Sequence, residues 1–187
     1  RGLGDVYKRQ ENVAEKYQIT RNDQDSFAFN SQKKAIKAIS ENKFKEEIVP
    51  IKLKDQKFFD KDEYPRSDTN LEKLSNLKTV FKKNGTVTAG NASGLNDGAA
   101  AVTLMNYKTS KDKGLKPIAK IVSWAQSGVD PKLMGTGPIP ATKLALKKAG
   151  WNINDLDLVE SNEAFAAQSV AVIKELGLKN DIVNVNG

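Results

Sequence analysis

Two short stretches hold most of the side chains that could take part in chemistry. Residues 89–98 read Ala-Gly-Asn-Ala-Ser-Gly-Leu-Asn-Asp-Gly, and residues 161–166 read Ser-Asn-Glu-Ala-Phe-Ala. In the first stretch, three glycines among small side chains let a backbone approach a ligand closely. In the second, the amide of Asn162 and the carboxylate of Glu163 follow an apolar segment, at the kind of strand end where α/β proteins bind ligands. Both stretches are therefore candidates for a ligand site.

Each stretch also has a purely structural interpretation. Asn162 is well placed to be the N-cap of a following helix, with Glu163 in its first turn and Phe165 in the core. Residues 89–98 are equally typical of a tight turn before a small-residue segment. They lack the Lys of a phosphate-binding P-loop and the glycine spacing of a Rossmann motif. The residues alone leave both interpretations open.

Two further segments are weaker candidates. Met134-Gly-Thr-Gly-Pro-Ile-Pro140 is a rigid loop before a helix, and such loops either shape a substrate pocket or serve only as connections. Arg66 stands among many lysines, and a guanidinium suits a planar or phosphate-bearing partner. A surface salt bridge is the alternative for Arg66.

The composition excludes several kinds of chemistry inside this chain. The 187 residues include no cysteine and no histidine, so the chain carries no disulfide, no thiolate nucleophile and no thiolate metal site. The net charge of +7 comes from lysines spread along the chain, and no nucleic-acid reading motif accompanies them. We therefore expect a solvated basic surface and no nucleic-acid binding. No apolar run is long enough to span a bilayer and no secretory leader is visible, so we expect no membrane insertion and a cytoplasmic protein.

Predicted helices and strands alternate along the chain. Helices are expected from around Glu11, from the N-cap Thr20 with Asp23 as its capping-box partner to about Glu41, at Leu71–Leu77, at Pro140–Gly150 and at Glu163–Leu176. Strands are expected at 48–53, 117–124, 156–160 and 182–185. Residues 99–105 are expected to end in a buried strand or to be a helix leading into one. This alternation predicts the α/β class.

Several motifs, in their order along the chain, resemble biosynthetic thiolases from about Glu11 to Gly187. The order of the set carries the resemblance rather than any one motif. The motifs are Glu-Asn-Val-Ala14, Glu-Glu-Ile-Val-Pro50, Thr-Val-Thr-Ala-Gly-Asn-Ala-Ser-Gly94, Asn-Asp-Gly-Ala-Ala-Ala101, Val129-Asp-Pro, Met134-Gly-Thr-Gly-Pro-Ile-Pro-Ala, Asn162-Glu-Ala-Phe-Ala and Val183-Asn-Val-Asn-Gly187.

The resemblance implies a layered α-β-α-β-α fold that is incomplete here. By analogy, residues 11–92 belong to the family's loop domain, 93–116 end its N-terminal half and 117–187 begin its C-terminal half. Residues 1–10 fit less well, because Val6-Tyr-Lys-Arg-Gln10 stands where the family has Met-Gly-x-Thr-Ala. We interpret residues 1–10 as a non-native junction.

The resemblance also implies a reaction: acetyl-CoA C-acetyltransferase, an acyltransferase of fatty acid metabolism. Thiolases condense two acetyl-CoA molecules to acetoacetyl-CoA by Claisen chemistry, or run the reverse thiolysis. The coenzyme A thioester is the substrate, no covalently bound cofactor or metal is implied, and a homotetramer is expected. The family's two cysteines and its histidine have no counterpart between Glu11 and Gly187, so we predict that this chain is inactive alone.

The family's functional residues map onto seven positions of this sequence. Asn162 matches the asparagine that holds a catalytic water in an oxyanion hole. The positions expected at the coenzyme A and acyl pocket are Ala89 and Ser93 (pantetheine channel), Arg66 (nucleotide part), Met134 and Phe165 (thioester and acyl end), and Ala164 beside them.

Two alternatives remain within the resemblance. One is a degradative 3-ketoacyl-CoA thiolase with longer substrates, although the Met134-Gly-Thr-Gly loop favours short chains. The other is a pseudo-thiolase that binds coenzyme A or a lipid without chemistry.

Overall fold

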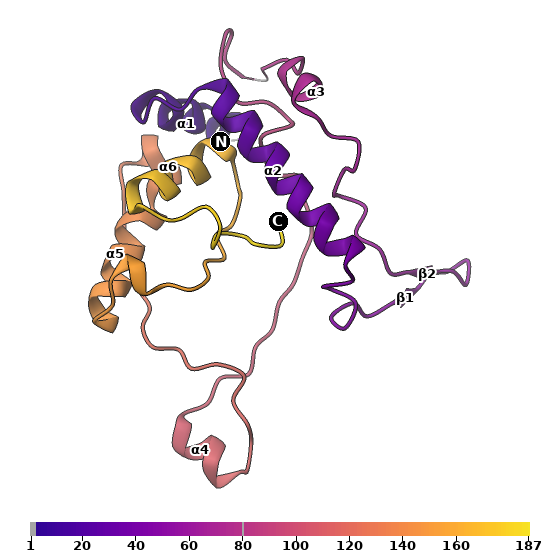
Figure 1. The fold of residues 1–187 in the computed structure, drawn as a ribbon, viewed down its shortest axis with the longest axis vertical. Helices are drawn as coiled ribbons and strands as arrows, with labels where there is room; N and C mark the ends of the chain where they lie inside the picture. The colour runs from indigo at the N-terminus through magenta and orange to yellow at the C-terminus, as the bar shows by residue number, and fades with distance from the viewer. Residues whose placement is uncertain (1–2, 80) are drawn as a thin grey trace.

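The computed structural model describes residues 3–79 and 81–187, and helices dominate this part of the chain (Figure 1). In chain order the elements are α1 (Leu3–Lys16), α2 (Arg21–Ser40), β1 (Ile51–Lys52), β2 (Phe58–Phe59), α3 (Leu71–Ser75), α4 (Tyr107–Asp112), the 3-10 helix η1 (Pro131–Thr136), α5 (Pro138–Ala149), the 3-10 helix η2 (Ile153–Asp155) and α6 (Ala166–Leu176). Strands β1 and β2 form an antiparallel hairpin, with Ile51 opposite Phe59 and Lys52 opposite Phe58.

Helix α6 lies at the centre of the packing, in contact with α1, α2, α5 and η1. Its Ala167 and Ala171 are fully buried and pack with Val13, Ala14 and Ile19 from α1 and the turn that follows it. On another side of α6, Val172 and Leu176 pack with Ile139 of α5. Small side chains at 167 and 171 let the neighbouring helix approach closely, and this fixes the position of the loop that precedes α6.

Three helix-boundary signals of the sequence are confirmed, at Thr20, Gly150 and Gly177. The Thr20 hydroxyl accepts a hydrogen bond from the Asp23 backbone N–H, and the Thr20 backbone N–H donates to the Asp23 carboxylate, which is a complete capping box. Gly150 and Gly177 follow α5 and α6 with φ of 70° and 66°. This left-handed conformation strains any residue with a Cβ, so glycine is the favoured helix stop there.

Three predicted helix starts were wrong. Helix α1 begins at Leu3 rather than around Glu11, so residues 3–10 belong to the helix. The Gln10 side chain is buried. Helix α5 begins at Pro138, two residues before Pro140. Helix α6 begins at Ala166 rather than Glu163, and its N-cap is Phe165 without a side-chain hydrogen bond. The N-cap interpretation of Asn162 is therefore wrong.

The predicted strands are largely missing from the described residues. The segment 48–53 contributes only the two residues of β1. The segments 156–160 and 182–185 are reduced to one parallel bridge between Val159 and Val183. Residues 99–105 and 117–124 form neither a strand nor a helix, and α4 interrupts the polar connection between them. A strand needs a neighbour for its backbone N–H and C=O groups, and these segments have none here.

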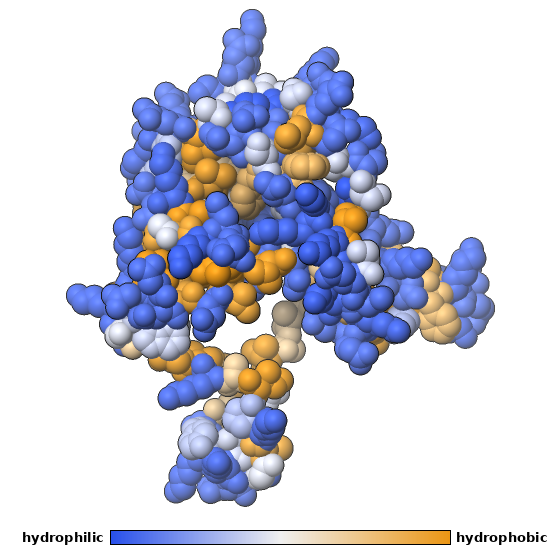
Figure 2. All heavy atoms as spheres, viewed as in Figure 1, coloured by the Kyte–Doolittle hydropathy of each residue, from blue (hydrophilic) through white to orange (hydrophobic). Residues whose placement is uncertain are grey.

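The two unpaired segments leave large apolar side chains in solvent. Val102 and Leu104 are 82% and 69% exposed, and Ile121 and Trp124 are 64% and 69% exposed. In Figure 1 the chain descends to α4 and returns through these segments, and Figure 2 shows apolar atoms at the surface around them. No described helix is both long and apolar enough to cross a membrane.

Candidate functional site

The two stretches that carry the chemical side chains lie side by side. Ala92 and Phe165 form an antiparallel bridge. The Ser93 N–H donates to the Ala164 carbonyl at 3.0 Å, and the Ala166 N–H donates to the Asn91 carbonyl at 2.9 Å. Main-chain hydrogen bonds therefore join residues 91–93 to 164–166, although about 70 residues separate them in sequence.

A cavity of about 680 Å³ opens beside this junction, between α2, α3 and the two stretches. Four of the seven predicted site residues line it: Arg66, Ala89, Ser93 and Asn162. The Asn162 side chain is exposed and makes no hydrogen bond to any described residue. An amide with free donor and acceptor groups in a cavity is suited to hold a water or a polar ligand atom.

Helix α1 holds the start of the first stretch through one buried carboxylate. Glu11 is 5% exposed, and its carboxylate accepts from the Thr86 N–H, the Val87 N–H and the Thr86 hydroxyl, each at 2.9 Å. A buried carboxylate is costly unless several donors satisfy it, so residues 86 and 87 are fixed where they meet Glu11.

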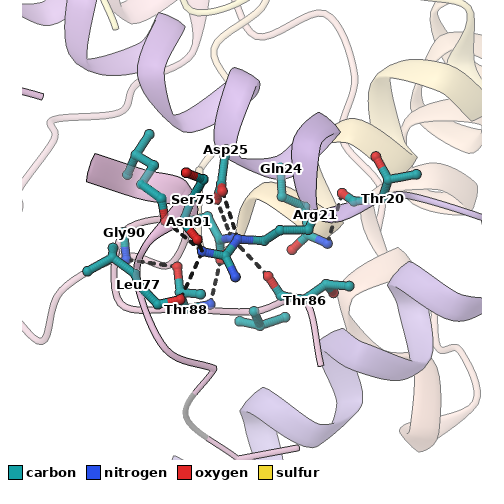
Figure 3. Close-up of polar contacts among 12 residues, drawn as sticks. Thr20, Arg21, Gln24, Asp25, Ser75, Leu77, Thr86, Thr88, Gly90 and Asn91 are labelled. Carbon is teal, nitrogen blue, oxygen red and sulfur yellow. Dashed lines mark hydrogen bonds and ion pairs between the residues drawn. The ribbon is translucent and has the colours of Figure 1, made fainter. Parts of the chain in front are cut away.

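Helix α2 holds the same stretch through a second buried carboxylate (Figure 3). Asp25 accepts from the Arg21 guanidinium at 2.7 Å and from the Asn91 amide at 2.9 Å. The oxygen of that amide accepts from the Thr88 N–H at 2.8 Å. Arg21 also donates to the carbonyls of Leu74, Ser75 and Leu77, so one network links α2, the end of α3 and the cavity wall.

The second stretch is held from α2 and from the end of the chain. The Ser31 hydroxyl of α2 donates to the Glu163 carboxylate. The Asn184 amide donates to the other Glu163 oxygen at 2.7 Å and to the Ser161 carbonyl at 2.8 Å. Glu163 therefore lies between Ser31 and Asn184, while its neighbour Asn162 faces the cavity.

Arg66 lines the cavity, and no described carboxylate forms an ion pair with it. Its backbone N–H donates to the Gln32 side chain at 2.7 Å, which fixes the Arg66 backbone against α2. The other cation of the lining, Lys73, is paired with Asp68 at 2.7 Å. The hydrogen bond and the charge of Lys73 lower the pKa of the Asp68 carboxyl, and the charge of Arg66 also lowers it. The Arg66 guanidinium makes no hydrogen bond to a described residue, so its N–H groups can bind an anionic group.

Three predicted site residues lie outside the cavity lining. Ala164 joins the site only through its carbonyl. Phe165 is 8% exposed and packs edge-on against the Tyr7 ring, with centroids 5.1 Å apart. Met134 lies in η1, where its sulfur is 2.8 Å from the Arg9 guanidinium. Since Tyr7 and Arg9 both belong to residues 1–10, the segment predicted to be a junction covers two of the predicted acyl-pocket residues.

The sequence reasoning missed several residues that build this site. It assigned no role to Gln32, Ser31 or Asn184, because each acts only through contacts with residues more than 20 positions away. The residue type gave one signal for Asn184. Asparagine is among the residues that tolerate positive φ, and Asn184 adopts φ 43°. Among the described residues no cluster of acidic side chains is arranged to hold a metal ion.

Two family models match the chain. Residues 8–108 match the N-terminal domain of thiolase and residues 115–187 match its C-terminal domain. Among curated proteins, the acetyl-CoA acetyltransferase of Shinella zoogloeoides is 56% identical over 95% of this chain and 46% of its own length. The acetyl-CoA acetyltransferase of Syntrophomonas wolfei is 52% identical over 100% of this chain and 50% of its own length. The chain therefore spans about half the length of these relatives.

Solved structures show the same similarity in three dimensions. The crystal structure of the Bacillus anthracis acetyl-CoA acetyltransferase matches with a TM-score of 0.93 and 51% identity, over 97% of this chain and 47% of that one. The human mitochondrial 3-ketoacyl-CoA thiolase, solved in complex with CoA, matches with a TM-score of 0.92 and 46% identity, over 97% and 46% of the two chains. The fold is thus an incomplete version of the one in these structures.

Proposed function

Because this chain belongs to the thiolase family, we propose that it is part of an acetyl-CoA C-acetyltransferase. That enzyme condenses two acetyl-CoA molecules to acetoacetyl-CoA or cleaves acetoacetyl-CoA with coenzyme A. The observation that carries the proposal is the cavity that brings Arg66, Ala89, Ser93 and Asn162 together in a chain of this family.

The proposed division of labour follows from the chemistry of each side chain. Asn162 holds a water by its uncharged amide and so helps to polarise a thioester oxygen, where negative charge develops during the reaction. Ala89 and Ser93 offer a narrow wall of small side chains to the pantetheine arm. The unpaired guanidinium of Arg66 binds a phosphate of the nucleotide part. The thiolate nucleophile and the imidazole come from outside these 187 residues, which hold no cysteine and no histidine.

Identity favours the acetyl-CoA branch over the longer-chain branch. The curated acetyl-CoA acetyltransferases are 51–56% identical to this chain. Among the solved structures, identity is 51% to the Bacillus anthracis acetyl-CoA acetyltransferase, 45–46% to the human 3-ketoacyl-CoA thiolase and 42% to the Syntrophomonas wolfei acetyl-CoA acetyltransferase, so the support comes from the curated proteins. A 3-ketoacyl-CoA thiolase is the second candidate. We further propose that the complete protein is a cytoplasmic homotetramer.

A full-length chimera tests the activity. The part of this chain aligned with the Shinella zoogloeoides enzyme replaces the matching segment of that enzyme, which supplies the rest of the fold. We expect the chimera to cleave acetoacetyl-CoA and to prefer it over longer 3-ketoacyl-CoA substrates, and we expect no turnover by the isolated 187-residue chain. A folded chimera that binds coenzyme A without turnover would favour the pseudo-thiolase. A preference for long chains would favour the second candidate.

Asn162→Ala in the chimera tests the proposed role of the amide. Removing one oxyanion-stabilising group typically lowers kcat by about 100-fold or more. We expect a fall of this order with a small change in KM. Asn154→Ala is the matched control, since Asn154 is an exposed asparagine of η2 away from the cavity. An equal kcat for both variants would contradict the role.

A further inference from the structure

Asn184 contacts the residues on both sides of Asn162. The Ser161 N–H donates to Asn184 Oδ1 at 2.7 Å, and Asn184 Nδ2 donates back to the Ser161 carbonyl at 2.8 Å. The same Nδ2 donates to Glu163 Oε1 at 2.7 Å. One side chain therefore makes three hydrogen bonds to positions 161 and 163, and the amide of Asn162 between them stays free to face the cavity.

The backbone of Asn184 is itself fixed. Its N–H donates to the Val159 carbonyl at 2.9 Å and the Val159 N–H donates to the Ile182 carbonyl at 2.9 Å, so segments 159–161 and 182–184 run parallel and in register. Asn184 is 5% exposed and adopts φ 43°, a conformation that few non-glycine residues accept. Burial, register and backbone conformation together aim this side chain at the Asn162 loop.

Helix α2 also contacts Glu163 and the segment that carries Asn184. Lys34 Nζ donates to the Val183 carbonyl at 2.8 Å, next to Asn184, and Ser31 donates to Glu163. The loop 161–163 is therefore held between α2 and the segment 182–184. The Asn162 loop has no regular secondary structure and precedes the first residue of α6, so these contacts fix it together with the main-chain hydrogen bonds that join residues 91–93 to 164–166.

We propose that Asn184 is a positioning residue for Asn162, which it holds through the backbone of Ser161 and the carboxylate of Glu163. This inference rests on the proposed function for its kinetic consequence, but its geometric part does not. A displaced catalytic group costs rate rather than substrate affinity when it acts mainly in the transition state.

Asn184→Gly is the informative variant. Glycine accepts φ 43° without strain, so this substitution removes the three side-chain hydrogen bonds and leaves the backbone conformation accessible. Asn184→Asp is the second variant, because it keeps the acceptor for the Ser161 N–H, loses both donations and places a carboxylate against that of Glu163. Asn180→Gly is the matched control, since Asn180 is an exposed asparagine of the same connecting segment.

Kinetics of the full-length chimera give the first readout. We expect Asn184→Gly to lower kcat by about ten-fold or more while KM changes by less than about two-fold, and we expect Asn184→Asp to lower kcat at least as much. In an Asn162→Ala background, Asn184→Gly should lower kcat little further, because the group it positions is gone. An unchanged kcat, or fully additive effects of the two substitutions, would overturn the inference.

Amide hydrogen exchange gives a second readout that needs no turnover. We expect Asn184→Gly, but not Asn180→Gly, to speed exchange in peptides that contain the Ser161 amide. Unchanged exchange there overturns the positioning role whatever the kinetics show. If the parent chimera is inactive but exchange responds as expected, the proposed function fails and the positioning geometry stands.

Discussion

Two carboxylates that do not line the cavity hold one of its walls. Glu11 of α1 binds the backbone of residues 86 and 87, and Asp25 of α2 binds Asn91. The partners of both carboxylates are backbone amides or uncharged side chains together with one guanidinium. At the scale of single residues, the shape of the site is therefore set by Glu11 and Asp25, whose positions in the sequence do not indicate that they support it.

Glu11→Gln tests this support in the chimera. The glutamine amide group turns one acceptor into a donor that faces backbone N–H groups, so a buried donor is left unsatisfied. We expect a loss of about 1–3 kcal/mol in the free energy of unfolding. Glu15→Gln is the control on the same helix, because the Glu15 side chain is 75% exposed and its ion pair with Lys82 is 3.4 Å long. Urea unfolding measures both, and equal losses would contradict a special role of Glu11.

Arg66→Ala tests recognition of the nucleotide part of coenzyme A. Because Arg66 is proposed to bind the nucleotide part rather than the reacting thioester, we expect KM for acetoacetyl-CoA to rise about ten-fold, which is about 1.4 kcal/mol, with kcat little changed. The matched control is a change of substrate: an acetoacetyl thioester of pantetheine lacks the nucleotide and should not respond to the substitution. A rise in KM for both substrates would assign Arg66 a structural role instead.

At the scale of elements, local signals were readable from sequence and long-range pairings were not. The Thr20 capping box and the glycines at 150 and 177 act within a few residues, and the structure confirms each. Segment 117–124 was predicted to be a strand, and 99–105 to end in a strand or to be a helix leading into one, but a strand exists only where another strand pairs with its N–H and C=O groups. The start of α6 was missed because Asn162 has a helix-capping side chain that faces the cavity instead.

The site was also predictable only in part, because the contacts that support it join residues far apart in sequence. The resemblance to thiolases identified Arg66, Ala89, Ser93 and Asn162, which the structure brings to one cavity. Their roles in catalysis and binding stay predictions. The supporting residues Glu11, Asp25 and Asn184 were not found, because each acts through contacts with residues 21 to 76 positions away.

The capping box of α2 gives a prediction with a pH dependence. The hydrogen bonds from Thr20 lower the pKa of Asp23 below its usual value of 3.8, so the ionised carboxylate stabilises the fold above that pH. We expect Thr20→Ala to cost about 1 kcal/mol at pH 7. The difference in stability between the parent and Asp23→Asn should shrink as the pH falls through the lowered pKa.

Urea unfolding of the chimera between pH 7 and pH 3 measures this dependence. Asp97→Asn removes a carboxylate from an exposed loop and serves as the control, with no pH-dependent difference expected. A loss of stability for Asp23→Asn that stays constant down to pH 3 would contradict the capping explanation.

At the scale of the whole molecule, the chain is a partial fold with open apolar surfaces. Its described part superimposes on less than half of structures such as the Bacillus anthracis enzyme with a TM-score of 0.93. More than half of that longer chain has no counterpart here, and segments 99–105 and 117–124 of this chain carry exposed apolar side chains. Unpaired, apolar and extended segments are templates for association.

We expect the isolated chain to self-associate through these segments. Lysines at the two most central positions, Val102→Lys and Ile121→Lys, should reduce the associated fraction at equal concentration by placing charge on the unpaired edges. Asn96→Lys with Asn154→Lys adds the same charge at exposed polar positions and is the control. Sedimentation velocity measures the effect, and equal association of both double variants would exclude the two segments as the contact.

The contacts of α2 with Glu163 and Val183 also affect the order in which contacts can form during synthesis of the chain. Ser31 and Lys34 of α2 meet partners that lie 132 and 149 residues further along the sequence. At 5–20 residues per second, a ribosome adds 132 residues in about 7–26 s. Helix α2 is complete long before Glu163 exists, so for that interval the Ser31 hydroxyl and the Lys34 ammonium lack these partners and are open to solvent and to any chaperone nearby. The contacts of α2 with Arg66, α3 and Asn91 can form earlier in synthesis, and those of Ser31 and Lys34 form last.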